Sequence, residues 1–220
     1  MRTRGHGALS TLVVRRLGLQ EYLPVWEKMQ DFTAKRDELT EDEVWLLQHP
    51  PVFTQGLNGK PEHILNVTNI PVVEIDRGGQ VTFHGPGQLI VYCLIDLKRN
   101  KMGVRQMVSA LENAVIDYLE DENVNARARK DAPGVYVNNA KVSALGLRVK
   151  RGCSYHGLSL NIDMDLSPFS RINPCGYKDL AITQLKSLGI DDSVETAEEK
   201  LLQKIIHQFD IDSISEVNGF

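Results

Sequence analysis

The chain is poor in cysteine, carries no excess of positive charge and has no long apolar run, and each shortage excludes a class of protein. Its three cysteines, Cys93, Cys153 and Cys175, are odd in number and irregularly spaced, so no disulfide framework is expected. The net charge of -4 gives no sign of nucleic-acid binding. No stretch approaches the ~18 consecutive apolar residues of a membrane-spanning helix. We therefore expect a cytoplasmic protein with reduced thiols that acts on small molecules or on other proteins.

The length of the chain favours one domain. With 220 residues it is long enough to bury a sizeable core as a single unit. The basic N-terminal residues are followed by an apolar stretch that is too short and too interrupted for a signal peptide. We expect one domain over residues 1–220, in which the last ten residues, 211–220, form a frayed tail.

Hydrophobic periodicity predicts three helices and two groups of strands. Apolar residues recur at intervals of three and four over 19–39, 103–122 and 194–209. Strand patterns occur at 12–16, 43–47, 52–54, 71–75, 89–97, 135–137, 142–149 and 155–162. Because the strands come in groups between widely separated helices, the expected fold class is α+β, with a mixed sheet flanked by helices.

Cys175 is the cysteine whose neighbours suit a reactive thiol. Pro174 before it fixes φ and removes a backbone donor, and Gly176 after it leaves room for another molecule to approach the sulfur. Neither neighbour suits the interior of a helix or strand, so we expect Cys175 on a loop, where reactive side chains concentrate. The alternative is a small buried hydrophobic residue.

Residues 76–88 carry four glycines, at positions 78, 79, 85 and 87, between two predicted strands. The segment lacks the Gly-Lys-Ser/Thr of a phosphate-binding P-loop, and Ile90 stands where a dinucleotide fingerprint needs its third glycine. Two interpretations remain. The glycines either serve sharp turns and a bulge, or they form a pocket wall whose backbone lies against a ligand.

Lys141 opens an otherwise apolar strand of small residues. A lysine there commonly extends its charge to solvent from an edge strand. In the functional interpretation its ammonium lies beside a thiol, where it favours the thiolate and lowers the cysteine pKa.

A third group of candidates lies at 152–161, where Cys153 and His156 are three residues apart. A metal site would need three or four ligands, and His84 or an isolated cysteine would have to complete it. His156 is also a candidate partner of Cys175 in a Cys-His pair. We favour a third role for His156, as a hydrogen-bonding residue of a pocket.

Taken together, segments 77–88, 141–148, 151–161 and 171–177 resemble, in order and spacing, the lipoyl(octanoyl) transferase family, the octanoyl-(acyl carrier protein):protein N-octanoyltransferases. The resemblance covers about residues 40–190, which we take as the core. It implies the fold of the biotin and lipoate protein ligases. It also implies transfer of an octanoyl group from acyl carrier protein to a lysine of a lipoyl domain, the first step of endogenous lipoate biosynthesis.

The resemblance also implies roles for particular residues. Cys175 resembles the catalytic nucleophile and Lys141 its activating partner. The residues that resemble the acyl-binding walls are Arg77, Gly78, Gly79, Gln80, Val81, Thr82, Phe83, His84, Ala144, Leu145, Gly146, Gly157, Leu158 and Ser159. Three positions depart mildly from the family pattern, which has serine at Ala144, tyrosine at Phe83 and phenylalanine at Tyr155.

The implied donor is octanoyl-acyl carrier protein, and the implied acceptors are the lipoyl domains of 2-oxoacid dehydrogenase E2 subunits and the glycine cleavage H protein. Neither ATP nor a metal is expected, because a thioester donor is already activated. The basic residues Arg148, Lys150 and Arg151 either dock an acidic carrier or form an ordinary solvated strand face.

Three alternative functions are considered beside octanoyl transfer. They are an ATP-dependent lipoate or biotin ligase on the same scaffold, a non-catalytic carrier-binding protein, and a cysteine hydrolase.

Overall fold

The computed structural model describes residues 11–66, 69–178 and 180–220, while the side chain of Cys175 lies outside the described part. The helices are α1 (Tyr22–Lys35), α2 (Val104–Asp121) and α3 (Val194–Gln208). The strands are β1 (Thr11–Leu19), β2 (Asp42–Gln48), β3 (Val52–Gln55), β4 (Val72–Glu74), β5 (Val81–His84), β6 (Gln88–Leu94), β7 (Arg127–Ala128), β8 (Gly134–Val137), β9 (Ala140–Lys150), β10 (Cys153–Asn161) and β11 (Ser213–Asn218). Short 3-10 helices are η1 (Pro61–His63), η2 (Ser167–Arg171), η3 (Pro174–Gly176) and η4 (Leu185–Leu188).

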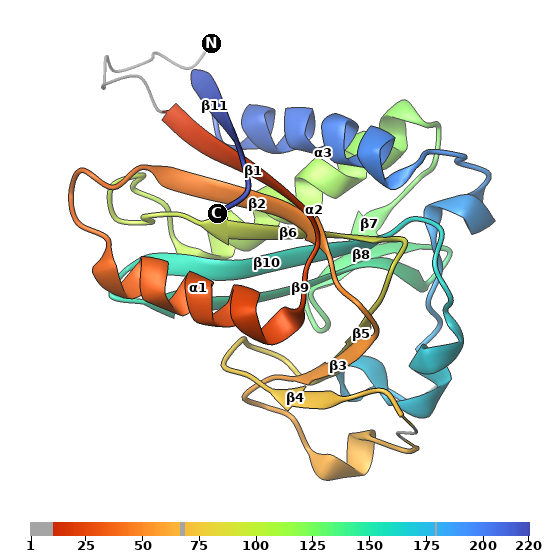
Figure 1. Cartoon of the computed structure of the whole chain (residues 1–220). Coiled ribbons are helices and arrows are strands. Elements are labelled where there is room, and N and C mark those ends of the chain that lie inside the picture. Colours follow the sequence, from red (N-terminus) through yellow and green to blue (C-terminus); the bar gives the residue numbers. More distant parts are fainter. Residues whose placement is uncertain (1–10, 67–68, 179) are drawn as a thin grey trace.

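Eight strands form a mixed sheet in the order β11-β1-β2-β6-β10-β9-β8-β7, and a smaller sheet has the order β4-β3-β5. The pairs β11–β1 and β1–β2 are parallel, and the remaining neighbours of the large sheet are antiparallel. Helices α2 and α3 lie on one face of this sheet, and α1 lies on the other, beside the small sheet (Figure 1). The predicted α+β class with a mixed sheet between helices is confirmed.

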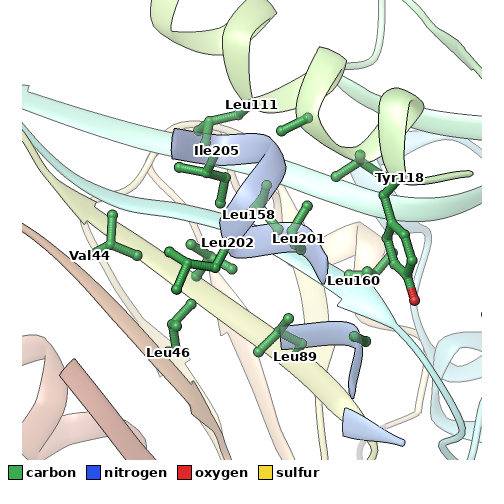
Figure 2. Close-up of a cluster of buried hydrophobic side chains, with 14 of the residues drawn as sticks. Val44, Leu46, Leu89, Leu111, Tyr118, Leu158, Leu160, Leu201, Leu202 and Ile205 are labelled. Atoms are coloured by element: carbon green, nitrogen blue, oxygen red, sulfur yellow. The ribbon is translucent and has the colours of Figure 1, made fainter. Parts of the chain in front are cut away.

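Strand β6 is buried on both faces because a layer covers each of them. Its residues Leu89, Val91 and Cys93 belong to the cluster packed against α2 and α3, which also includes Leu111, Tyr118, Leu201 and Ile205 (Figure 2). The alternate residues Ile90, Tyr92 and Leu94 belong to a second cluster, with Val25 and Met29 of α1. The apolar run predicted as a buried central strand therefore has a layer of side chains on each side.

The three predicted helices are present, with shorter bounds at α1. This helix begins at Tyr22, so Pro24 falls within its first turn, where proline is tolerated. Helix α3 is capped by Ser193, whose hydroxyl accepts a hydrogen bond from the backbone N–H of Thr196 (3.2 Å).

Strands β8, β9 and β10 form two hairpins, whose turns have the backbone geometry that an antiparallel pair requires. Asn138 and Asn139 join β8 to β9 with φ of 47° and 68°, and Arg151 and Gly152 join β9 to β10 with φ of 55° and 89°. Positive φ at both central residues is the geometry whose twist matches that of an antiparallel pair, and asparagine and glycine adopt it more readily than other residues.

The prediction of a frayed tail at 211–220 is wrong, because residues Ser213–Asn218 form β11 and pair in parallel with β1. All six side chains of β11 are exposed, so the sequence carries no burial pattern that would reveal a strand. The reason for the pairing lies in β1, whose outer backbone groups would otherwise form an open sheet edge. Strand β5 was not expected either.

No helix in the described ranges is both long enough and apolar enough to cross a lipid bilayer.

Candidate active site

Lys141 lies at the start of β9, beside an irregularity that sets the direction of its side chain. The pairing of β8 with β9 shifts between Val135 and Tyr136, which leaves Val142 as an extra residue in β9. Such a bulge interrupts the alternation of side chains along a strand. Val142 belongs to the core under α2 and α3, while Lys141 lines a cavity on the other face together with Ala144. Regular alternation would have put Lys141 on the face opposite to Ala144.

The Lys141 side chain is buried, with 2% of the residue exposed. Its Nζ donates a hydrogen bond to the Pro133 carbonyl (3.1 Å) and lies 5.2 Å from the centre of the Tyr136 ring. Nearby, the Glu112 carboxylate accepts the Gly134 N–H (3.0 Å). Burial raises the pKa of Glu112, and the positive charge of Lys141 opposes that rise. The amine is therefore held inside the protein among groups that suit a positive charge.

A cavity of about 530 Å³, counted with its open mouth, lies between the large sheet, the segment before β5 and the start of α1. Its walls are Tyr22, Arg77, Gly79, Gln80, Val81, Thr82, His84, Ile90, Tyr92, Ala144, Leu145, Gly146, His156, Gly157, Leu158 and Ser159.

A second cavity, of about 280 Å³, connects these walls to the predicted catalytic residues. It shares Thr82, Ala144 and Ser159 with the first cavity. Its other walls include Lys141 and Pro174, the residue before Cys175. The shared walls therefore place the first cavity next to the amine of Lys141 and to the turn that contains Cys175.

Glycine backbone forms part of the cavity wall, which favours the pocket interpretation of the glycine-rich segments. A Cβ added at Gly157 would lie 2.0 Å from the Val91 carbonyl oxygen, so only glycine fits there. A Cβ at Gly146 would lie 3.1 Å from Arg77 Cδ and 3.2 Å from the Gly78 carbonyl oxygen. At these two positions the strands β9 and β10 come close to neighbouring chain, and the absence of side chains keeps the cavity open.

One end of the cavity is closed by hydroxyl and imidazole groups that are bonded to each other. His49 Nδ1 lies 2.7 Å from the Gln20 carbonyl, so Nδ1 donates and Nε2 accepts from the Tyr92 hydroxyl (2.8 Å). Burial lowers the pKa of His49 to about 4, so the ring is neutral at pH 7. The Tyr22 ring stacks on His84 at a centroid distance of 6.0 Å. This end is therefore uncharged, although its residues are polar.

His84 begins a chain of hydrogen bonds that leads from the cavity wall toward Lys141. His84 Nδ1 donates to Gln88 Oε1 (2.7 Å), Gln88 Nε2 donates to Asn161 Oδ1 (2.8 Å), and Asn161 Nδ2 donates to the Thr183 carbonyl (2.9 Å). The Thr183 N–H in turn donates to the Lys141 carbonyl (2.9 Å). Burial lowers the pKa of His84 to about 3, so this ring is also neutral. The chain fixes the segment after η3 against β9.

Asp76 joins α1 to β10 beside the cavity. Its carboxylate accepts hydrogen bonds from Trp26 Nε1 (2.9 Å), Gln30 Nε2 (3.2 Å), His156 Nε2 (3.2 Å) and the Tyr155 hydroxyl. Burial disfavours the ionised carboxylate, but these donors outweigh it and hold the pKa of Asp76 well below its usual value. Burial also lowers the pKa of His156. His156 is thus a neutral hydrogen-bonding residue of the pocket wall, the role favoured from the sequence.

The backbone of Cys175 lies in η3, a single 3-10 turn, in keeping with the expected loop position. The preceding Asn173 N–H donates to the His63 carbonyl (2.8 Å), which ties the turn to η1. The following Gly176 adopts φ of 77°. Because the Cys175 side chain lies outside the described part, its predicted exposure and its proximity to Lys141 stay predictions.

The other two cysteines are unsuited to nucleophilic chemistry. Cys93 and Cys153 are both free and buried. Burial raises the pKa of Cys93 to about 12 and also raises that of Cys153, so neither supplies a thiolate at neutral pH. Within the described part of the chain no three His, Cys, Asp or Glu side chains are placed to hold a metal ion. Cys153, His156 and His84 therefore do not form the metal site considered from the sequence.

The structure brings most of the predicted wall residues together around the cavity. Those that line it are Arg77, Gly79, Gln80, Val81, Thr82, His84, Ala144, Leu145, Gly146, Gly157, Leu158 and Ser159. Gly78 and Phe83 are not among the residues that line it. The Gly78 N–H donates to the Leu147 carbonyl (3.0 Å), and Phe83 packs with Phe53 in a separate apolar cluster. Side chains alternate along a strand, so Phe83 of β5 points away from the cavity that Thr82 lines.

Three wall residues were missed in the sequence, namely Tyr22, Ile90 and Tyr92. Tyr22 was counted only as part of an apolar helix face, and the other two only as part of a buried strand. Alternation within the run 89–97 separates Ile90 and Tyr92 from the residues of the α2–α3 core, but it does not say which face borders a cavity.

The basic group Arg148, Lys150 and Arg151 lies at the far end of the β9–β10 hairpin. Lys150 is nine residue steps after Lys141 in β9, which at 3.3 Å per residue places the two about 30 Å apart. Arg151 Nη2 donates to the Ala34 carbonyl at the end of α1 (2.8 Å). Docking of a carrier at this group stays a prediction, and the distance along β9 weighs against it.

Comparison with known proteins agrees with this geometry. Residues 21–206 match the family model of the lipoyl protein ligase A/B catalytic domain. Among solved structures, a putative lipoate protein ligase from T. acidophilum with bound lipoic acid superimposes with a TM-score of 0.73 at 15% identity, over 93% of this chain and 89% of that chain. The biotin protein ligase from Aquifex aeolicus superimposes with a TM-score of 0.56 at 12% identity, over 90% and 70% of the two chains. At these identities the likeness shows the fold.

Closer sequence relatives carry a more specific name. An octanoyltransferase of Shewanella frigidimarina is 58% identical over 193 residues, which cover 88% of this chain and 89% of the relative. An octanoyltransferase of Hahella chejuensis is 54% identical over 219 residues, covering 100% and 98% of the two chains. The chain therefore belongs to the lipoyl protein ligase A/B catalytic-domain family and, within it, to the octanoyltransferases.

Proposed function

We propose that the protein transfers an octanoyl group from octanoyl-acyl carrier protein, through a thioester on Cys175, to a lysine of a lipoyl domain. The observation that carries this proposal is the wall shared by the two cavities, which leads from an apolar pocket to Lys141 and Pro174. The names of relatives more than 50% identical to the chain support the octanoyl group as cargo. The raised pKa values of the Cys93 and Cys153 thiols support Cys175 as the nucleophile.

In the first half-reaction the Cys175 thiolate attacks the thioester carbonyl carbon of the donor. A carbon–sulfur bond to Cys175 forms and the bond to the pantetheine sulfur breaks, so one thioester replaces another at little cost in bond energy. Lys141 holds the thiol proton as an ammonium and then gives it to the departing pantetheine thiolate. The products are an acylated Cys175, a free carrier thiol and a neutral Lys141.

In the second half-reaction the neutral amine of the acceptor lysine attacks the Cys175 thioester. A carbon–nitrogen bond forms, the carbon–sulfur bond to Cys175 breaks, and neutral Lys141 accepts the proton that the attacking nitrogen must lose. This step leaves an amide on the lipoyl domain and restores the thiolate and the ammonium. The cycle needs neither ATP nor a metal, because the donor thioester supplies the activation.

The dimensions of the larger cavity support an eight-carbon acyl group. Along β10 the wall runs from Ser159 to His156, three residue steps or about 10 Å. Seven carbon–carbon bonds at ~1.2 Å each along an extended chain span about 8 Å, by analogy with an extended backbone. At ~0.8 kcal/mol per buried methylene, the pocket contributes several kcal/mol to acyl binding. Tyr22 and Tyr92 at the closed end suit the selection of chain length.

The test is intact-protein mass spectrometry after the chain is mixed with octanoyl-acyl carrier protein in the absence of ATP. We expect a mass gain of one octanoyl group, which disappears from the enzyme and appears on a lipoyl domain when that domain is added. The variant Cys175→Ala should show no mass gain, whereas Cys93→Ala and Cys153→Ala should both be acylated.

The same experiment separates the proposal from an ATP-dependent ligase. Such a ligase holds an acyl-adenylate without a covalent bond, so it would octanoylate the lipoyl domain only with ATP and free octanoate, and Cys175→Ala would stay active. Full turnover by Cys175→Ala in the absence of ATP would contradict the proposed intermediate. Binding of the carrier without any acyl transfer would favour a carrier-binding protein instead.

A further inference from the structure

His63 borders the turn that carries Cys175, although η1 lies more than a hundred residues earlier in the sequence. Its carbonyl accepts the Asn173 N–H (2.8 Å), and its Nδ1 lies 3.5 Å from Asn173 Nδ2. On the other side of Cys175, the position that a Cβ of Gly176 would occupy is 3.3 Å from His63 Nε2. The imidazole therefore lies next to Asn173, which precedes the turn, and beside Gly176, the last residue of the turn.

The imidazole of His63 is positioned to exchange protons with a bound protein and with water. Its side chain is 15% exposed, and Nε2 lies 4.0 Å from Glu62 Oε1, which in turn lies 3.9 Å from Lys60 Nζ. The titratable residue in the sequence of the turn is Cys175, and the charged residue Arg171 ends η2 just before the turn. The segment before β5 presents the uncharged Gln80, whose Oε1 accepts the Lys60 N–H (3.1 Å).

The second half-reaction leaves one proton without an acceptor. The acceptor lysine enters as an ammonium at neutral pH, so its nitrogen must lose one proton before it attacks and a second proton as the amide forms. Neutral Lys141 accepts only one of them. We propose that His63 accepts the first proton. Loss of this proton frees the lysine amine for attack on acylated Cys175, and His63 then releases the proton to solvent. This role rests on the proposed function.

The other histidines of the described part are poorly placed for this step. Both ring nitrogens of His49 and of His84 are engaged in hydrogen bonds inside the protein. His156 is buried and bonded to Asp76. His207 lies on the exposed side of the last turn of α3. His63 is the histidine of the described ranges that borders η3, and imidazole is the side chain that exchanges a proton most readily near neutral pH.

The experiment measures the two half-reactions separately in single turnovers of the full chain carrying His63→Ala or His63→Gln. Acylation of Cys175 by octanoyl-acyl carrier protein should change by less than about twofold. Transfer to a lipoyl domain should slow by roughly 10- to 100-fold at pH 7, in the range of a lost general base. The deficit should shrink toward pH 9, because the acceptor lysine then loses its proton more often without help.

Two controls separate proton transfer from a structural role. Imidazole added to the buffer should restore transfer by His63→Ala, and the exposed His207→Ala should behave as the unaltered chain. The hydrogen bond from the Asn173 N–H to the His63 carbonyl involves only main-chain atoms, so both His63 variants keep the turn tied to η1. His63→Gln also retains polar side-chain atoms near Asn173. Equal slowing of both half-reactions, independent of pH and of added imidazole, would overturn the role. Absence of acylation in the unaltered chain would overturn the proposed function, and this role with it.

Discussion

Lys141 is an unusual lysine: it is buried, it lies in a strand, and its amine faces a cavity. The Pro133 carbonyl and the Tyr136 ring hold the amine, and Glu112 places a carboxylate behind it. A buried ammonium is costly unless such groups compensate it. An ammonium in this position favours the thiolate form of a neighbouring cysteine.

Replacing Lys141 with alanine should therefore reduce the reactivity of Cys175. In a chain that also carries Cys93→Ala and Cys153→Ala, the curve of alkylation rate by iodoacetamide against pH should move about one unit or more to higher pH, because a nearby cation is lost. A matched control is Lys35→Ala, at an exposed lysine on α1 paired with Asp31. Superimposable curves for Lys141→Ala and its parent would exclude thiolate activation by Lys141.

Sequence reasoning at the scale of single residues succeeded where the neighbours constrain the backbone. Pro174 and Gly176 predict a turn at Cys175, and η3 is that turn. The same reasoning could not identify His63, because the sequence 61–63 gives no sign that it meets 173–176 in space. Nor could it identify Tyr22, since an aromatic residue on an apolar helix face is equally typical of a core.

Among the elements, β9 decides the site through its bulge. Without the bulge, regular alternation would put Lys141 and Ala144, which are three residues apart, on opposite faces of the sheet, and only one of them would face the cavity. Sequence periodicity predicts the strand at 142–149 but not a bulge, because the pattern of apolar and small residues around Lys141 is compatible with either register.

Strand β11 is an element whose role is at the edge of the sheet and not at the cavity. It pairs only with β1, and both β1 and β2 separate it from β6. Phe220 follows it and lies 5.1 Å from Trp45 between ring centroids. These contacts suit a strand that closes an open edge.

Removal of residues 213–220 should therefore leave the chemistry intact and weaken the fold. We expect acylation of Cys175 within about twofold of the full chain, a loss of roughly 1–3 kcal/mol in the free energy of unfolding, and self-association through the exposed edge of β1. Urea unfolding and light scattering measure the last two effects. Ile214→Ser, which keeps the backbone pairing, is the control. A folded, truncated chain that no longer accepts the acyl group would show that β11 supports the site.

At the scale of the whole molecule, burial keeps two histidines at the cavity, His49 behind its wall and His84 in it, neutral. His49 and His84 have pKa values of about 4 and about 3, both lowered mainly by burial. An unfolded histidine titrates near 6.5. Between pH 6.5 and 4 the unfolded chain thus binds more protons than the folded chain, and the stability must fall as the pH falls.

We expect the free energy of unfolding to decrease between pH 7 and pH 5, with about 2 kcal/mol from each of His49 and His84 at 1.36 kcal/mol per pKa unit. Urea unfolding at the two pH values measures this. His49→Gln should flatten the dependence by about one histidine's share, whereas the exposed His207→Gln should not change it. The lowered pKa of Asp76 acts in the same direction but only below about pH 4. Equal pH dependence in His49→Gln would refute a buried neutral His49.

The amino-acid sequence by itself determined the elements that depend on local pattern, and its motifs identified the family. Apolar spacing defined three helices and the central strand, and the short motifs around Lys141 and Cys175 indicated an octanoyltransferase. Only the tertiary structure decided which residues meet. The bulge in β9, the placement of Tyr22 and Tyr92, the pairing of β11 and the contact of His63 with the Cys175 turn all depend on chain segments distant in sequence. A one-dimensional pattern reports burial and turns, but it does not report which buried surfaces face each other.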